Sequence, residues 1–506
     1  MNHIHYTDPG SVPGIMQRSL EAFNIYKGVG PRRRAEFLKA ISDSLGSMTD
    51  ELVVAAHSET NLDPSRLKVE LKRTQFQLQS YGQACADGNA LEIRIELPQQ
   101  GNSQPDIRKM RVPLGPVVVF GASNFPFAYS TAGGDTACAL AAGCAVVVKA
   151  HPAHAQTSQL VASAIEKAIE TCDLPRDLFI HIHAESFETA QALVLHPLTS
   201  AVGFTGSFEG GMALYNLASQ RTQPIPVFAE MGSVNPVFIM PGKIRLAQEE
   251  LADILAASIS QSAGQFCTQP GILVALEGEE LEKLKQNLVI QLEEVPSQKM
   301  LHEGIETSFN ERKGRAISQN GVSVIQGNSD LNRIDNGTVR PVLATVSAKD
   351  YLENPILHQE IFGPFSLLVS CSSIIEMRRV AASLEGQLTA SVFAEPGEMD
   401  QELTNILQCK CGRFIYNGVP TGVTVSSAMH HGGPFPATTD SRFTAVGADG
   451  IKRFSRPLCF QNWKDELLPA ELQNRNPLQL LRTINDIPSH EPIIINTTIN
   501  TPGSKP

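Results

Sequence analysis

Between residues 117 and 204, short apolar runs alternate with segments of helical periodicity. The apolar runs cover residues 117–120, 146–148, 179–182 and 201–204, and the helical segments cover 131–142, 155–171 and 186–195. Strands separated by helices pair in parallel, and the helices then cover both faces of the sheet. The alternation therefore predicts an α/β fold with a parallel sheet in this part of the chain.

The same pattern returns after residue 230, and helical segments precede the first sheet. We expect a helix at 246–262, a strand at 272–275, a helix near 279–294, a strand near 365–369, and helices over 15–57 and 66–85. At 506 residues the chain is long enough for two or three domains.

Two segments of alternating polarity, 91–97 and 107–112, predict a small two-stranded excursion. A hairpin of this size is not stable alone, so we expect it to dock elsewhere, for example on another subunit. The segment 453–461 is extended again, and residues 484–506 predict a polar, mobile tail.

Charge and cysteine content exclude several function classes. The net charge of −11 argues against nucleic acid or an anionic membrane as the main partner. The chain contains no apolar run of 18 residues, so no membrane span is predicted. The nine cysteines are odd in number and irregularly spaced, which indicates a reducing, cytoplasmic location.

Cys267 and Glu230 form the pair with the clearest chemical meaning. Cys267 stands in Gly264-Gln265-Phe266-Cys267-Thr268, among small and polar residues typical of an accessible turn. Glu230 follows the apolar run 225–229, where desolvation makes a carboxylate a better base. A thiol and a base suit a covalent acyl intermediate. The alternatives are an inert buried thiol and a surface carboxylate.

Three further candidates follow predicted strands. Asn124 would donate its amide to an oxyanion, or is an ordinary turn residue. Lys149 would reach a ribose or its 2′-phosphate, or lies on the surface. Gly206 and Ser207 would turn a helix N-terminus toward a pyrophosphate, or simply cap that helix.

Two familiar kinds of motif, a dinucleotide fingerprint and a histidine metal site, give no evidence for a ligand in this chain. No Gly-X-Gly-X-X-Gly run follows a strand, so the ordinary dinucleotide fingerprint is missing. Adjacent His430 and His431 point in different directions, so they are not expected to share a metal, and no metal site is predicted.

Taken together, the candidate segments resemble the aldehyde dehydrogenase superfamily. The matching runs occur in the family's order and at near-family spacing, within a resemblance that extends from about residue 10 to about residue 465. They are Asn124-Phe125-Pro126, Val148-Lys149, Phe204-Thr205-Gly206-Ser207, Glu230-Met231-Gly232, Gly264-Gln265-Phe266-Cys267 and Glu360-Ile361-Phe362-Gly363-Pro364.

This resemblance implies an architecture of several parts. It implies a Rossmann-like cofactor domain over 1–90 and 114–229 and an α/β catalytic domain over 230–445. A small β oligomerisation element would combine 91–113 with 446–465, followed by a C-terminal segment and tail over 466–506. Such an excursion predicts a homodimer or a homotetramer.

The resemblance also implies roles for single residues. Cys267 would be the nucleophile, Asn124 would stabilise the oxyanion together with the Cys267 backbone N–H, and Glu230 would activate the water that hydrolyses the thioester. The implied cofactor-binding residues are Lys149, Gly206, Ser207, Gly210, Met231, Glu360 and Phe362.

Longer runs narrow the resemblance to one branch, which contains 2,5-dioxovalerate (α-ketoglutaric semialdehyde) dehydrogenases and an NADP-preferring fatty-aldehyde dehydrogenase. These runs are 134–137, 149–154, 228–233 and 431–443. NAD-preferring members often carry an acid three residues after the lysine, where this chain has Pro152. Without that acid we expect NADP to be used at least comparably to NAD.

The branch predicts oxidation of a small aldehyde, with α-ketoglutaric semialdehyde as the favoured substrate. A fatty or general aldehyde is the first alternative, and a non-catalytic dehydrogenase-like structural protein is the remote one. Many family members carry Pro-Trp where this chain has Ala122-Ser123, which would reshape the substrate tunnel. The expected pocket residues are Ser123, Phe127, Phe266, Thr268 and Arg442, the last as a candidate cation for the substrate carboxylate.

Overall fold

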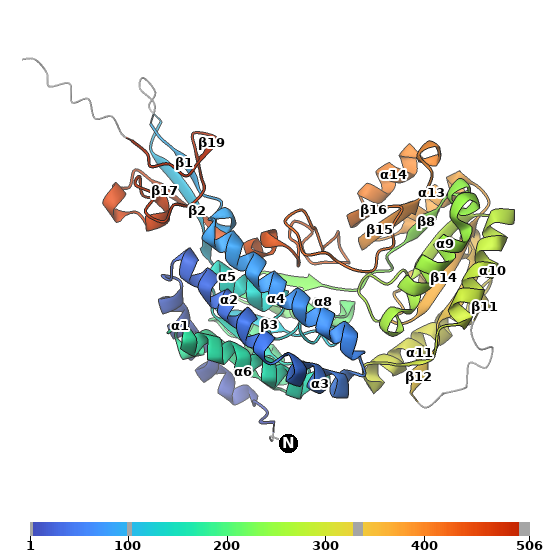
Figure 1. Cartoon of the computed structure of the whole chain (residues 1–506), viewed down its shortest axis with the longest axis horizontal. Coiled ribbons are helices and arrows are strands. Elements are labelled where there is room, and N and C mark those ends of the chain that lie inside the picture. The colour runs from blue at the N-terminus through green and yellow to red at the C-terminus, as the bar shows by residue number, and fades with distance from the viewer. Residues whose placement is uncertain (1–3, 99–103, 327–336, 495–506) are drawn as a thin grey trace, which may run out of the picture.

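Two α/β lobes lie side by side, and a small sheet projects from the first lobe (Figure 1). This computed structural model describes residues 4–98, 104–326 and 337–494. Among these residues, no helix is both long and apolar enough to cross a membrane.

The first lobe contains a five-stranded sheet in the order β5-β4-β3-β6-β7, and all neighbouring strands are parallel. The predicted parallel sheet is therefore confirmed. Its strands are β3 (Val117–Phe120), β4 (Val146–Lys149), β5 (Phe179–Ile182), β6 (Ala201–Thr205) and β7 (Val227–Glu230).

In the described part of the first lobe, eight helices surround the two faces of this sheet. They are α1 (Val12–Tyr26), α2 (Pro31–Ser47), α3 (Thr49–Thr60), α4 (Pro64–Ala86), α5 (Gly134–Ala142), α6 (Ala155–Thr171), α7 (Phe187–Leu195) and α8 (Phe208–Ser219). Val117 and Val119 face the hydrophobic cluster that contains residues of α2 to α6, whereas Val118 and Phe120 face a cluster with α7 and α8. This alternation is the two-residue period of a strand that is buried on both faces.

The predicted helical region 15–57 is three helices rather than one. Pro31 occupies the first turn of α2, where its missing N–H and fixed φ suit a helix start and exclude continuation from α1. Met48 adopts a non-helical conformation between α2 and α3. Apolar periodicity continues across both breaks, which is why the sequence pattern did not separate them.

The second lobe contains a seven-stranded sheet in the order β11-β13-β14-β9-β8-β15-β16. Only the β11–β13 pair is antiparallel. The strands are β8 (Val237–Ile239), β9 (Ile272–Leu276), β11 (Ser323–Gln326), β13 (Val342–Ser347), β14 (Phe365–Cys371), β15 (Gln387–Phe393) and β16 (Cys411–Tyr416). Separate hydrophobic clusters pack on its two faces, so this sheet is also covered on both sides.

The helices of the second lobe follow the same alternation. They are α9 (Pro241–Ser260), α10 (Glu279–Glu293), α11 (Glu303–Ile317), α12 (Ala348–Glu353), α13 (Ile374–Ser383) and α14 (Gln401–Gln408). Two short strands, β10 (Gln298–Lys299) and β12 (Thr338–Val339), pair separately.

The projecting sheet has the order β17-β2-β1-β18-β19. Its strands are β1 (Arg94–Glu96), β2 (Ile107–Pro113), β17 (Ser455–Gln461), β18 (Arg482–Ile484) and β19 (Ile487–Ser489). The expected pairing of the excursion with the late extended segment is present as β2 with β17.

The expectation of a polar tail from residue 484 is wrong for residues 484–494, which extend this sheet and pack beside it. Arg482 is 1% exposed and donates to the carbonyls of Gln473 and Glu491, which fixes the segment through backbone acceptors. Such bonds leave no apolar pattern in the sequence. Residues 495–506 lie outside the described residues.

A late segment of the chain returns from the second lobe to the first. The N–H of Met231 donates to the carbonyl of Ala437 at 2.8 Å, and the N–H of Thr439 donates to the carbonyl of Ala229 at 3.1 Å. These bonds hold the segment along the edge strand β7, so residues just before 437 lie close to Glu230 at the end of β7.

Candidate active site

Cys267 follows a turn in which three successive residues adopt left-handed backbone angles. Ser262, Ala263 and Gly264 have φ values of 50°, 55° and 64°. A Cβ at Gly264 would collide with the backbone of Gly363, so the two segments approach each other with no side chain between them. This close approach explains Gly264, whereas a Cβ at Gly363 would collide with the ring of Phe309. It brings Cys267 next to the segment that begins at Glu360.

Asn235, which the sequence analysis did not single out, holds the Cys267 segment in place. Its Nδ2 donates to the carbonyl oxygens of Cys267 at 2.8 Å and Gln269 at 3.0 Å. Its Oδ1 accepts from Ser233 and Thr389. A fully buried and fully paired amide favours a single loop geometry. The only sequence signal was its place five residues after Glu230.

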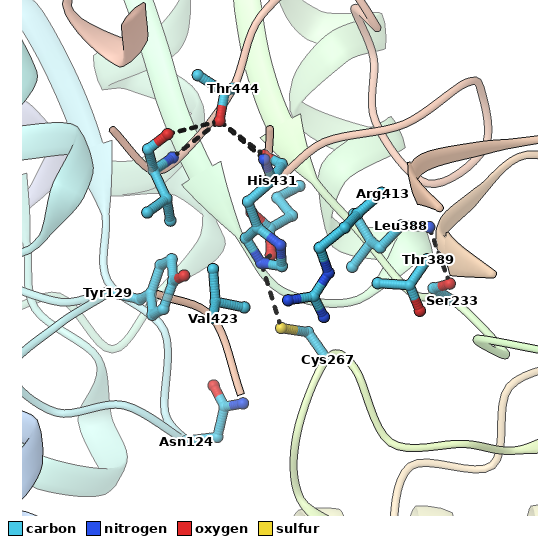
Figure 2. Close-up of polar contacts among 12 residues, drawn as sticks. Asn124, Tyr129, Ser233, Cys267, Leu388, Thr389, Arg413, Val423, His431 and Thr444 are labelled. Carbon is cyan, nitrogen blue, oxygen red and sulfur yellow. Dashed lines mark hydrogen bonds and ion pairs between the residues drawn. The ribbon is translucent and has the colours of Figure 1, made fainter. Parts of the chain in front are cut away.

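Cys267, Glu230 and His431 converge from three segments of the chain. Sγ of Cys267 lies 3.6 Å from Nε2 of His431 (Figure 2). The same nitrogen lies 2.9 Å from Oε1 of Glu230, and the two side chains are 0% and 4% exposed. This approach is not a formed hydrogen bond, because neither Glu230 oxygen has a hydrogen-bond partner among the described residues. Glu230 is therefore free to bind and deprotonate a water.

His431 is the main residue of this centre that the sequence analysis missed. It weighed His431 only as a metal ligand paired with His430. The imidazole lies 164 positions from Cys267, and no local pattern links the two. Its backbone N–H donates to Thr444 Oγ1 at 2.9 Å, which fixes the segment that delivers the ring.

Burial raises the pKa of the Cys267 thiol well above its ordinary value, and the Glu230 carboxylate adds to this increase. The Arg413 guanidinium acts in the opposite direction. The resting thiol is therefore protonated near neutral pH, and a thiolate forms only when a proton acceptor is within reach. His431 Nε2, in contact with the sulfur, is placed to accept that proton.

The same three side chains could in principle hold a metal, since their ligand atoms all lie within 4.8 Å of one another. A thiolate, an imidazole and a carboxylate suit Zn²⁺. Bound zinc would, however, occupy the sulfur that must attack a substrate. The free Glu230 oxygens and the left-handed turn before Cys267 suit a nucleophile and a base, so we interpret the cluster as a centre for covalent catalysis.

Asn124 lies in the loop after β3, close to the Cys267 segment (Figure 2). Its Nδ2 donates to the carbonyl of Gln265 at 3.2 Å, two residues before the cysteine, and the residue is 9% exposed. A neutral amide in this place could stabilise an oxyanion on a group bound to the sulfur. That role stays a prediction.

Two predicted cofactor contacts lie at carboxyl ends of strands in the first sheet. Lys149 ends β4 and has no hydrogen-bond or ion-pair partner among the described residues. Burial lowers the pKa of its ammonium group. Ser207 caps α8 by accepting the N–H of Gly210 at 3.1 Å, and the N–H of Gly206 donates to the carbonyl of Glu230 at 3.0 Å. A half-buried, unpaired cation and a capped helix N-terminus, both at carboxyl ends of strands in one sheet, suit an anionic ligand such as a dinucleotide.

The remaining predicted cofactor contacts lie around Glu360. Its Oε1 accepts the N–H of Ser233 at 3.3 Å, and a Cβ at Gly232 would collide with its carboxylate. Burial raises the pKa of the Glu360 carboxyl to about 7. Met231 is buried in a hydrophobic cluster of the first lobe, whereas Phe362 is half-buried.

The predicted substrate-pocket residues divide into two groups. Phe266 packs edge-on against Phe125 with ring centroids 5.3 Å apart, directly before Cys267. Ser123 is half-buried beside Asn124, and Thr268 is 1% exposed. These three therefore flank the catalytic cluster in the chain.

Phe127 and Arg442 have different surroundings from the other three. Phe127 is 1% exposed and belongs to the hydrophobic core of the first lobe, because its N–H is held by the buried Glu70 carboxylate. Arg442 is 80% exposed and pairs with Asp440 at 2.6 Å, since the two side chains lie on the same surface turn. An exposed, neutralised guanidinium is a poor candidate for the cation that a substrate carboxylate needs.

Comparisons with known proteins agree with this geometry. The family model described as "Aldehyde dehydrogenase family" matches residues 1–434. "Alpha-ketoglutaric semialdehyde dehydrogenase 2" of Azospirillum brasilense is 42% identical over 467 residues, which cover 91% of this chain and 89% of the relative. "Alpha-ketoglutaric semialdehyde dehydrogenase" of Acinetobacter baylyi is 41% identical over 477 residues, which cover 93% and 90%.

Solved structures share the fold. Betaine aldehyde dehydrogenase from Staphylococcus aureus, in complex with NAD+, has a TM-score of 0.76 at 16% identity, over 90% of this chain and 88% of that one. A 1-pyrroline-5-carboxylate dehydrogenase from Thermus with bound NAD also has a TM-score of 0.76, at 18% identity over 90% and 86%. At these identities the likeness concerns the fold alone.

Proposed function

The chain belongs to the aldehyde dehydrogenase family, and on that premise we propose that it oxidises α-ketoglutaric semialdehyde to 2-oxoglutarate through a thioester on Cys267. The observation that carries the chemistry is the convergence of a thiol, an imidazole and a buried carboxylate whose oxygens accept no hydrogen bond from the described residues. The substrate is supported by the names of two relatives that are 42% and 41% identical to this chain.

The first half of the reaction forms the bond to sulfur. His431 takes the thiol proton, and the Cys267 thiolate attacks the aldehyde carbon, which converts the carbonyl oxygen into an oxyanion. The Asn124 amide and the Cys267 N–H would stabilise this charge. Collapse of the oxyanion expels the hydride from carbon and leaves a thioester. When bound, the nicotinamide supplies the acceptor for that hydride.

The second half of the reaction releases the acid. Glu230 deprotonates a water, and the hydroxide attacks the thioester carbon while the Cys267 thiolate leaves. The Cys267 thiolate regains its proton from His431, the released acid ionises to a carboxylate, and the proton taken by Glu230 passes to solvent, so two protons are released per turnover. Neither Glu230 oxygen has a hydrogen-bond partner among the described residues, which supports the proposal that Glu230 is the base for this step.

The residues present fit a dinucleotide cofactor. Lys149 and the Gly206–Ser207 turn would hold the adenosine ribose and the pyrophosphate, and Glu360 would accept hydrogen bonds from the nicotinamide ribose. Pro152 replaces an acid that would repel a 2′-phosphate, so we expect NADP to support turnover at least comparably to NAD. Steady-state kinetics with both cofactors test this, and a large preference for NAD would contradict it.

Two coarser features of the molecule support proposals about its assembly and location. Exposed Phe414 and Tyr416 on the edge strand β16, together with exposed Trp463 beside the projecting sheet, suit association into a homodimer or homotetramer. Light scattering that found a stable monomer would contradict this. All nine cysteines are unpaired, which supports a reducing, cytoplasmic location.

The proposed reaction is tested by comparing aldehydes and by trapping the intermediate. α-Ketoglutaric semialdehyde should be turned over with a higher kcat/KM than a long-chain aldehyde. Mass spectrometry of enzyme quenched with cofactor and substrate should find an acyl adduct on Cys267. Preference for the long-chain aldehyde would favour a fatty-aldehyde dehydrogenase, and absence of any adduct at Cys267 would refute the covalent route.

A further inference from the structure

Arg413 on β16 lies beside the catalytic cysteine. Figure 2 shows its guanidinium pointing toward Cys267, with His431 on one side. Its Nη1 donates to the carbonyl of Gly422 at 2.7 Å, and its Nη2 donates to the carbonyl of Pro420. Its Nε is buried and has no partner among the described residues. The loop that follows β16 therefore holds this positive charge in the pocket.

Arg73 on α4 reaches the same loop from the other lobe. Its Nε donates to the carbonyl of Val423 at 3.4 Å, and its Nη2 donates to Oη of Tyr129 at 3.2 Å. The guanidinium also lies over the Tyr129 ring, 5.2 Å from its centroid. Because Gly422 and Val423 are adjacent, Arg73 and Arg413 bind neighbouring carbonyls of one loop.

Neither of these charges is neutralised by protein. Among the described residues, no carboxylate lies within ion-pair distance of Arg73 or Arg413, and their hydrogen bonds go to neutral oxygens. The buried Arg453, in contrast, lies 2.6 Å from a carboxylate oxygen of Asp135. Burial lowers the pKa of Arg413, as expected for a charge that lacks a counter-ion. Burial also acts to lower the pKa of Arg73, but Tyr129 and the more distant Glu70 outweigh it and the pKa is raised. A bound anion would offset the desolvation penalty of Arg413.

We propose that Arg73 and Arg413 form a carboxylate subsite that binds the acid end of the substrate. This inference rests on the proposed function and names the residues that select its substrate. In an extended α-ketoglutaric semialdehyde the carboxylate carbon lies about 5 Å from the aldehyde carbon. A molecule attached to Cys267 therefore reaches a guanidinium that faces the sulfur. Arginine binds a carboxylate through two parallel N–H···O bonds.

Two other arginines are weaker candidates for this role. Arg66 is buried near the pocket, but its Nη2 donates to the Asn124 carbonyl at 2.8 Å and its Nη1 lies 3.6 Å from Glu70. Arg442 is exposed and paired with Asp440. Each already has an anionic partner, whereas Arg73 and Arg413 do not.

The test compares two five-carbon aldehydes, α-ketoglutaric semialdehyde and pentanal, which differ in the presence of the acid end. Arg413→Met should lower the ratio of kcat/KM for the acid-bearing aldehyde to kcat/KM for pentanal about 30- to 100-fold. Pentanal oxidation also slows, because the guanidinium lowers the pKa of the Cys267 thiol, so the ratio reports the subsite and the pentanal rate reports the thiol. Arg73→Met should also lower the preference for the acid-bearing aldehyde. Arg413→Lys should lower it less than Arg413→Met, because lysine keeps the positive charge. Arg379→Met, on an exposed position of α13, is the matched control and should match the wild type.

Pentanal turnover by the same variant reports whether the fold and the reaction centre are intact, since Arg413 also holds the 420–423 loop. Equal loss with both aldehydes, or an unchanged preference for the acid in both variants, would overturn the subsite. Loss of that preference in Arg442→Met instead would overturn it as well.

A second readout separates this inference from the proposed function. A wild type without preference for the acid-bearing aldehyde would contradict the proposed substrate. Inhibition by 2-oxoglutarate still tests the subsite in that case, because Arg413→Met should raise the inhibition constant at least about tenfold if the subsite binds carboxylates. An unchanged inhibition constant would overturn the subsite.

Discussion

The reaction centre and the carboxylate subsite share one pocket but are built in different ways. In the reaction centre, Cys267 and Glu230 come from short runs that contain glycines, and a side chain at these glycines would collide with a neighbouring segment. The subsite takes Arg73 from α4 of the first lobe and Arg413 from β16 of the second. Local backbone geometry therefore shapes the segments that carry the nucleophile and the base, whereas recognition depends entirely on how the lobes pack. Changes in the reaction centre should affect all aldehydes equally, whereas changes in the subsite should affect aldehydes with an acid end more than those without one.

The largest effect is expected for Cys267→Ala. Without the sulfur no acyl intermediate forms, so turnover of both α-ketoglutaric semialdehyde and pentanal should fall by at least about 10⁴-fold. Steady-state assays with both aldehydes measure this, and the thermal melting curve controls for folding. A folded variant that still oxidised one of the two aldehydes at an appreciable rate would break the comparison, because the two would then not share a nucleophile.

Glu230→Gln should separate the two halves of the reaction. Loss of the base slows thioester hydrolysis by about 10²- to 10⁴-fold, while acylation of Cys267 continues. Rapid mixing should show one equivalent of reduced cofactor per site, followed by a slow phase, with either aldehyde. If the burst disappeared as well, Glu230 would act before acylation and the assignment of the proton acceptor to His431 would need revision.

His431→Asn is expected to have an intermediate effect that depends on pH. Burial and Glu230 keep the pKa of the Cys267 thiol high, so without the imidazole the thiolate forms only at higher pH. We expect kcat/KM to fall about 10- to 100-fold near neutral pH and the rising limb of its pH profile to move to higher pH. A profile identical to that of the wild type would mean that His431 only fills space.

Glu360 gives the smallest expected effect and concerns the cofactor rather than the aldehyde. Its pKa is raised to about 7, so it is protonated below that pH and accepts hydrogen bonds from a ribose less well. The KM for the cofactor should therefore rise a few-fold as the pH falls from 8 to 6, with little change in the preference between aldehydes. Glu360→Gln should remove most of this dependence. A cofactor KM that is flat with pH in the wild type would contradict the role.

Much of the first lobe could be predicted because its strands are short, apolar and buried on both faces. Strands 117–120 and 179–182 and helix 155–171 lie where the pattern indicated. Helix ends were less certain, since apolar spacing continues across Pro31 and Met48. The last strands, β18 and β19, were missed because each spans only three residues and the buried Arg482 between carbonyls resembles a surface residue in the sequence.

The sequence by itself determined the parallel sheet, the cysteine with its upstream glutamate, and the glycines that let their segments approach. These features follow from neighbours in the chain, through strand periodicity and backbone angles. Only the tertiary structure decided that His431 contacts the sulfur, that Asn235 holds the cysteine loop, and that Arg413 rather than Arg442 faces the pocket. The function of each of these polar side chains depends on the residues that it contacts in another segment. Packing between elements distant in the sequence decides which residues those are.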